Sequence, residues 1–85
     1  MPRYRLIMAD GTECEVGLCG AADGVLWIQV YGMTMMAACT WFSEPEKTRE
    51  MVYDTGNFQD TFTGYTDLFS VQTRDDFVSV GIKRE

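Results

Sequence analysis

Apolar and polar residues alternate on both sides of the dipeptide Asp10-Gly11, between residues 3 and 18. This pattern is typical of a β-hairpin. A two-residue turn at Asp10-Gly11 would place apolar side chains directly opposite glutamates, because directly opposed residues share a face. A three-residue turn with Gly11 left-handed in a bulge shifts the pairing by one residue, and a one-residue shift exchanges the core and solvent faces. We therefore predict the bulged turn, which pairs Met8 with Thr12, Leu6 with Cys14, Tyr4 with Val16 and, on the solvent side, Arg5 with Glu15.

The next segments predict a loop and then a strand. Residues 19–24, Cys-Gly-Ala-Ala-Asp-Gly, are small and are predicted to form a loop. Residues 25–31 alternate Leu, Ile and Val with Trp27, Gln29 and Tyr31, so both faces of the predicted strand carry large side chains. Either this strand is central in its sheet, or Trp27 and Tyr31 form a contact surface. We favour packing for both rings, because large aromatic side chains usually serve the core.

One short helix is predicted over residues 34–42, with Thr34 as its N-cap. The helix cannot continue through Pro45, whose ring would clash with the carbonyl four residues earlier. Ser43 and Glu46 have the spacing of a capping box, which predicts one further helical turn before the next strand. The residues expected to face the core follow the spacing i, i+3, i+4 and i+7: Met35, Ala38, Cys39 and Phe42.

The C-terminal half contains four strand patterns, at residues 49–54, 58–63, 68–73 and 77–82. Gly64 interrupts this series and predicts a bulge or a bend. For the last hairpin we predict a turn around residues 74–76. This turn places Val71 opposite Val78 and Phe69 opposite Val80 inside the protein.

Size and charge limit the classes of function. The chain has 85 residues, enough for one domain (1–85), and 46% of them are hydrophobic, which excludes disorder. Seven basic and 13 acidic residues give a net charge of −6, which disfavours a nucleic-acid partner. The apolar runs are too short to span a membrane. Since Met1-Pro2-Arg3 leads directly into a strand pattern, we expect no signal peptide and a cytoplasmic location.

The sequence gives little support to catalysis or metal binding. It has three cysteines, no CxxC pair and no histidine, so a zinc site is not indicated and the thiols are expected to be reduced and mostly buried. Asp54–Asp60 lacks the ligand spacing of an EF-hand. A Cys or Ser nucleophile would have no histidine as its base. We predict that the protein is not an enzyme and needs no cofactor.

Three motifs carry a family resemblance: Asp10-Gly11-Thr12, "FSEPEKT" at residues 42–48, and "GYTDL" at residues 64–68, followed by a closing V-x-V-x-I strand. Together they resemble small uncharacterised proteins encoded in prophages of gut Firmicutes. There a "DGT" turn leads through F-S-x-P-E-x-T and G-Y-T-x-L to a final strand. The resemblance implies a phage-derived protein, in the context of a virion or of tail assembly.

The predicted fold is α+β and mostly antiparallel β, a small barrel- or roll-like sheet of six to seven short strands with one short helix. The predicted function is that of a non-enzymatic structural or assembly protein of phage origin, which acts through protein–protein contacts and self-associates. The alternative is an acidic inhibitor of a host nuclease or defence enzyme that mimics DNA. A third hypothesis is a small-ligand binder that uses the interior of the sheet. The residues predicted to be exposed for contact are Trp27, Tyr31, Trp41 and Tyr65.

Overall fold

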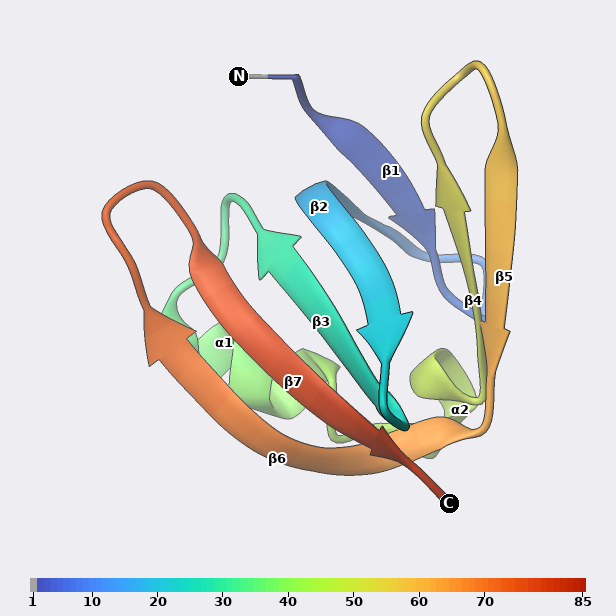
Figure 1. Ribbon diagram of the computed structural model, residues 1–85. Coiled ribbons are helices and arrows are strands. Elements are labelled where there is room, and N and C mark those ends of the chain that lie inside the picture. The colour runs from blue at the N-terminus through green and yellow to red at the C-terminus, as the bar shows by residue number, and fades with distance from the viewer. Residues whose placement is uncertain (1) are drawn as a thin grey trace.

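The computed structural model describes residues 2–85, which form one seven-stranded antiparallel sheet and two short helices (Figure 1). The strands are β1 (Tyr4–Ile7), β2 (Glu13–Ala22), β3 (Val25–Val30), β4 (Glu50–Asp54), β5 (Gln59–Thr63), β6 (Tyr65–Thr73) and β7 (Val78–Arg84). The helices, both between β3 and β4, are α1 (Met35–Trp41) and α2 (Pro45–Thr48). The strand order is β5-β4-β1-β2-β3-β7-β6. The predicted fold class, α+β with mostly antiparallel strands, is confirmed.

The sheet curls but remains open. Its two edges are β5 and β6, although only Gly64 separates these strands in sequence. Gly64 has φ +82°, a left-handed conformation that favours glycine, so the predicted bend at this position is confirmed. Among residues 2–85, β5 and β6 form no ladder with each other. The barrel-like shape is therefore present only as an open curl (Figure 1).

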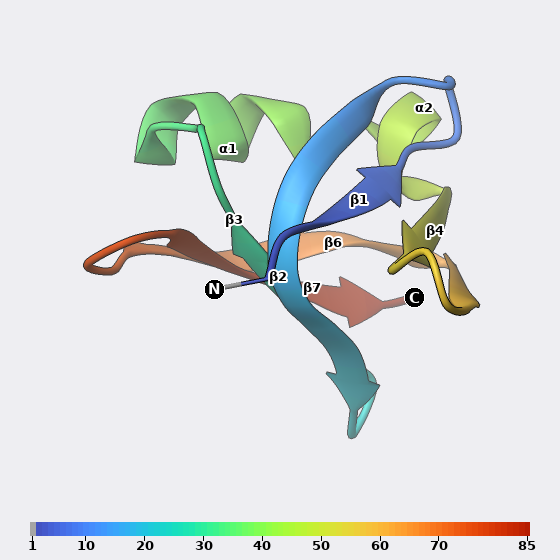
Figure 2. The same cartoon turned by 90° about the horizontal axis from the view of Figure 1, so that it is seen from above.

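Both helices lie on the same side of the sheet and cover the core (Figures 1 and 2). Helix α1 packs on β6 and β7, and both Ala38 and the C-cap residue Phe42 are fully buried. Full burial of one large apolar side chain stabilises the fold by about 1.5–3 kcal/mol. The strand residues that complete this core include Leu6, Val16, Leu26, Ile28, Val30, Met51, Val80 and Ile82. None of the helices formed by residues 2–85 is long and apolar enough to cross a membrane.

The register predicted for the first hairpin is confirmed. Gly11 has φ +88°, and the Met8 N–H donates to the Thr12 carbonyl at 2.7 Å, so the turn is the bulged one. The observed pairs are Tyr4 with Val16, Arg5 with Glu15 and Leu6 with Cys14. The hydrophobic pattern therefore sets the register of this hairpin.

The predicted loop at residues 19–24 is wrong. These residues continue β2 as far as Ala22, and only Asp23 and Gly24 form the turn into β3. Both turn residues have positive φ, 54° and 76°. This is the conformation that a tight two-residue hairpin turn needs, and Asp-Gly is a preferred sequence for it.

The predicted helix exists, but half of its predicted core face is wrong. The Thr34 hydroxyl accepts the Ala37 N–H at 3.1 Å, as expected for an N-cap. Met35 and Cys39 are exposed, however, while Trp41 packs against the core beside Phe42. Because α1 lies against β6 and β7, its buried stripe passes through positions 38, 41 and 42.

The predicted capping box at Ser43 and Glu46 is also wrong. The Ser43 hydroxyl donates to the Cys39 carbonyl and so belongs to the end of α1. The N-cap of α2 is Glu44, which has an extended backbone and makes no side-chain capping bond. The residue before a proline is driven to this extended conformation, so Pro45 fixes the start of α2.

In the last hairpin the predicted pairs Val71–Val78 and Phe69–Val80 are wrong by two residues. The turn spans residues 74–77 and is closed by the Arg74 N–H, which donates to the Phe77 carbonyl at 2.8 Å. Val71 therefore lies opposite Val80. A two-residue shift keeps Val71 on its predicted face, but the register changes between Leu68 and Ser70, and Phe69 is exposed at this irregularity.

Candidate functional site

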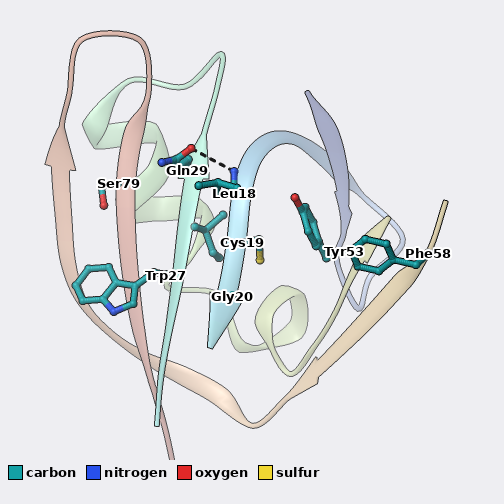
Figure 3. A pocket seen from close by; sticks show the side chains of 9 residues that line it. Leu18, Cys19, Gly20, Trp27, Gln29, Tyr53, Phe58 and Ser79 are labelled. Atoms are coloured by element: carbon teal, nitrogen blue, oxygen red, sulfur yellow. Dashed lines mark hydrogen bonds between the residues drawn. The ribbon is translucent and has the colours of Figure 1, made fainter. Parts of the chain in front are cut away.

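A cavity of about 650 Å³ opens beside the second half of β2 (Figure 3). Its walls come from β2, β3, β4, β7 and the loop between β4 and β5. No charged residue lines it within the described part of the chain. The lining residues are Leu18, Cys19, Gly20, Trp27, Ile28, Gln29, Tyr53, Phe58 and Ser79.

The alternation of β3 places part of this wall on the sheet face opposite the helices. Leu26, Ile28 and Val30 point into the core, so Trp27 and Gln29 point the other way. Directly opposed residues share a face, and the pairs Gln29–Ser79 and Trp27–Gly81 extend this surface across β7. The side of β3 and β7 that α1 does not cover therefore carries Trp27, Gln29 and Ser79 of the lining.

A bulge in β2 turns Leu18 out of the core. The pairing of β2 with β3 changes register between Val16 and Cys19. Two side chains hold the displaced backbone: the Gln29 amide oxygen accepts the Leu18 N–H at 3.2 Å, and the Tyr53 hydroxyl donates to the Gly17 carbonyl at 2.7 Å. Leu18 is left 70% exposed at the rim of the cavity.

Trp27 is held in place by an aromatic neighbour and a glycine. Its ring meets Phe69 edge to face, with 5.6 Å between the ring centroids. Gly81 lies beneath both rings, since a Cβ at this position would be 2.7 Å from Trp27 and 3.1 Å from Phe69. The Lys83 ammonium group lies 4.8 Å from the Phe69 centroid. We call Leu18, Trp27, Phe58 and Phe69 the apolar face; each is at least 43% exposed.

The two titratable side chains in the cavity are kept neutral. Burial raises the pKa of the Cys19 thiol to about 12, with smaller contributions from Cys14 and Asp60. Burial also raises the pKa of Tyr53. A thiol that stays protonated is a poor nucleophile.

Of the four residues predicted to be exposed for contact, Trp27 is 43% exposed and lines the cavity. The prediction of exposure is wrong for Tyr31 and Tyr65, which are 5% and 7% exposed. The Tyr31 ring packs against Phe77 and the Arg3 guanidinium. The Tyr65 ring packs against Phe62 and the Arg84 guanidinium. Trp41 is half-buried, with Lys47 at 5.0 Å from its ring centroid. The structure therefore does not bring these four residues into one surface.

Three residues of the apolar face were missed from the sequence. Leu18 continues the alternation of Cys14 and Val16 and therefore looks like a core residue until the bulge is known. Phe69 likewise looks like a core residue from the alternation in β6. Phe58 directly follows a turn, so no alternation of residues indicates which way its side chain points. Gly17, which lies inside the strand pattern, was the sequence signal of a bulge or a close approach.

Comparison of the chain with protein-family models, curated proteins and solved structures finds no match. The site must therefore be interpreted from its own geometry.

Proposed function

We propose that this chain is a non-enzymatic structural or assembly protein of phage origin that acts through protein–protein contacts and self-associates. The observation that carries the proposal is the apolar face around the uncharged cavity. Exposed aromatic and aliphatic side chains gathered around a concave surface are typical of a contact site. The phage context rests on the motif resemblance alone.

The chemistry of the cavity favours binding over catalysis. The Cys19 thiol stays protonated at neutral pH, and the Tyr53 hydroxyl is occupied by its hydrogen bond to the Gly17 carbonyl. Gln29 and Ser79 supply neutral polar groups that can orient a bound chain.

An acidic inhibitor that mimics DNA has less support. Such a protein needs a run of free carboxylates, but several acidic residues are paired with cations on the surface. Glu15 lies 2.8 Å from Arg3, and Asp10 lies 3.2 Å from Lys47. Arg5 bridges Glu13 and Asp54 in the same way, so the surface of β1, β2 and β4 has mixed charge.

The first test is the absolute mass of the purified chain, measured by light scattering after size exclusion at low and at high salt. We expect an oligomer that persists at high salt, because contacts between apolar surfaces are not screened. Leu18→Ser and Phe58→Ser should each lower the mass. The matched control is Met36→Ser, which removes an 80% exposed apolar side chain from α1, on the other side of the sheet.

A monomer at every concentration would contradict self-association. An oligomer that dissociates at high salt would indicate that the charged surface of β1, β2 and β4 makes the contact instead. An oligomer that responds to Met36→Ser but not to Leu18→Ser would place the contact on the helices.

A further inference from the structure

The two neighbours of β2 pair with different parts of it, and among residues 2–85 their ladders overlap only at Val16. β1 pairs with Glu13–Val16, and β3 pairs with Val16 and with Cys19–Ala22. Among residues 2–85, no strand pairs with the other edge of Cys19–Ala22, which we call the open edge. Figure 1 shows β2 bending away from β1 at this point. An unpaired edge is a template for pairing with another chain.

The pairing of β2 with β3 identifies the main-chain groups that the open edge presents. Ala22 and Val25 flank a two-residue turn and lie opposite each other, so they exchange hydrogen bonds. Bonded and non-bonded pairs alternate along an antiparallel ladder. The N–H and C=O groups of Cys19 and Ala21 therefore point away from β3. The open edge offers two donors and two acceptors.

Gly20, in the middle of the open edge, has no structural reason to be glycine. Two other glycines, Gly17 and Gly81, lie against side chains that a Cβ would strike. A Cβ at Gly20 would meet nothing within 4 Å, and its φ is not left-handed. A glycine in a strand often marks the close approach of another backbone. The glycines whose positive φ accounts for them are Gly11, Gly24, Gly32, Gly56 and Gly64.

The cavity lies against the same segment. Cys19 and Gly20 form one wall, and Tyr53 and Phe58 lie across from them (Figure 3). A strand added along the open edge would direct alternate side chains to opposite faces, so every second side chain could enter the cavity. Main-chain bonds would supply affinity, and the cavity would select the side chain, as in other strand-addition sites.

The charges define the occupant further. None of the described residues that line the cavity is charged, so the side chain that enters it must be uncharged. Asp60 on β5 lies directly opposite Tyr53 of the cavity lining, and the whole chain carries −6. An incoming segment without acidic residues, flanked by Lys or Arg, therefore complements the site.

We propose that the open edge binds an extended, uncharged segment of another protein chain, which adds as a strand beside β2 and places one apolar side chain in the cavity. This inference rests on the proposed function, because it names the kind of partner that the contact site accepts.

The test begins with a selection from a library of random short peptides displayed on phage, using the full chain as the target. The tightest peptide is then synthesised in a series, each member N-methylated at one position. N-methylation removes one main-chain donor. We expect affinity to fall about tenfold at every second position and to change little at the positions between them, because alternate N–H groups of an added strand face β2.

The matched variants are Ala21→Pro and Ala21→Ser. Proline removes the Ala21 N–H from the open edge and leaves the β3 ladder intact, while serine keeps that N–H. We expect Ala21→Pro to lower the affinity for the selected peptide about tenfold. The affinity of Ala21→Ser for the same peptide should stay within about twofold of that of the natural chain. Urea unfolding of each variant verifies its fold. The N-methyl series tests the proposal independently if Ala21→Pro fails to fold.

Failure to select any peptide would overturn the inference, as would N-methyl losses without alternation. Binding of the neutral dye N-phenyl-1-naphthylamine in the cavity, with no peptide selected, would assign the site to small apolar molecules instead. If the chain forms a salt-resistant oligomer that Ala21→Pro leaves intact and no peptide binds, the proposed function stands and strand addition is excluded. A monomeric chain that selects no peptide would contradict both.

Discussion

Gly20 and Gly81 offer a matched test of how the apolar face is built. Both lie directly opposite Trp27, one on β2 and the other on β7, so the three residues form one row across the sheet. Neither glycine has a left-handed φ. The Trp27 ring leans over Gly81 and leaves Gly20 open. Alanine at the two positions should therefore have opposite effects on stability.

The expected magnitudes follow from these contacts. Alanine in place of glycine stabilises a compatible strand position by about 0.5–1 kcal/mol, mainly because the unfolded chain loses freedom. Gly20→Ala should show this gain. At Gly81 the new Cβ would be 2.7 Å from the Trp27 ring, so the ring must move and the edge-to-face pair with Phe69 is lost.

Overpacking costs about 1–3 kcal/mol and the lost aromatic pair about 0.5–1.5 kcal/mol. Both rings are nearly half exposed, so they can swing outward and the lower part of this range applies. After the glycine gain is subtracted, Gly81→Ala should destabilise by roughly 1 kcal/mol. The two variants should then differ by about 2 kcal/mol, or by roughly 8–16 °C in Tm.

Urea unfolding followed by far-UV circular dichroism measures this difference, and equal m-values verify that both variants unfold from the same compact state. Phe69→Ala serves as the internal control, since the penalty at Gly81 should shrink once the second ring is absent. Equal stability changes at Gly20 and Gly81 would refute the packing argument.

Two further predictions concern titratable groups. Ellman's reagent should react at once with the exposed Cys39, while the buried Cys14 should react only as the chain unfolds. The half-buried Cys19, whose pKa burial raises to about 12, should react more slowly than Cys39, and rapid reaction of Cys14 would contradict its burial. Bonds from Thr12 lower the pKa of Asp10 to about 2, below its unfolded value, so the stability that Asp10 contributes is complete above about pH 4 and is lost as the pH falls towards 2. Asp10→Asn should flatten this part of the curve of urea midpoint against pH, and an unchanged curve would show that the Asp10 bonds do not form.

The parts of the fold that the sequence predicts correctly are those in which one local rule dominates. In the first hairpin, a wrong register would place glutamates in the core, so burial decides the pairing. Pro45 ends α1 by steric clash, and Gly64 gives the bend between β5 and β6. These outcomes need no knowledge of distant contacts.

The errors occur where two local options compete, and in the strands tertiary contacts decide between them. Ser43 can cap a new helix or close the previous one, and the extended conformation imposed on Glu44 settles the choice. The exposure of Leu18 and Phe69 depends on irregularities in β2 and β6 that shift the pairing with neighbouring strands. Such irregularities leave the alternation in the sequence unchanged, so the apolar face could not be assembled from the pattern alone.

The bulge in β2 links the stability of the fold to the proposed binding site. A side chain at Gly17 would lie 2.9 Å from the Gln29 amide oxygen and 3.1 Å from the Tyr31 ring, so this position admits only glycine without rearrangement. Beyond Gly17, β2 no longer pairs with β1. The Tyr53 hydroxyl donates a hydrogen bond to the Gly17 carbonyl and so replaces a strand partner at this position. The same irregularity turns Leu18 outward at the rim of the cavity, just before the open edge at Cys19–Ala22. A single backbone feature, stabilised by the core residue Tyr53, thus places Leu18 on the apolar rim beside the open edge, and any change that restores regular pairing at Gly17 should remove Leu18 from that rim.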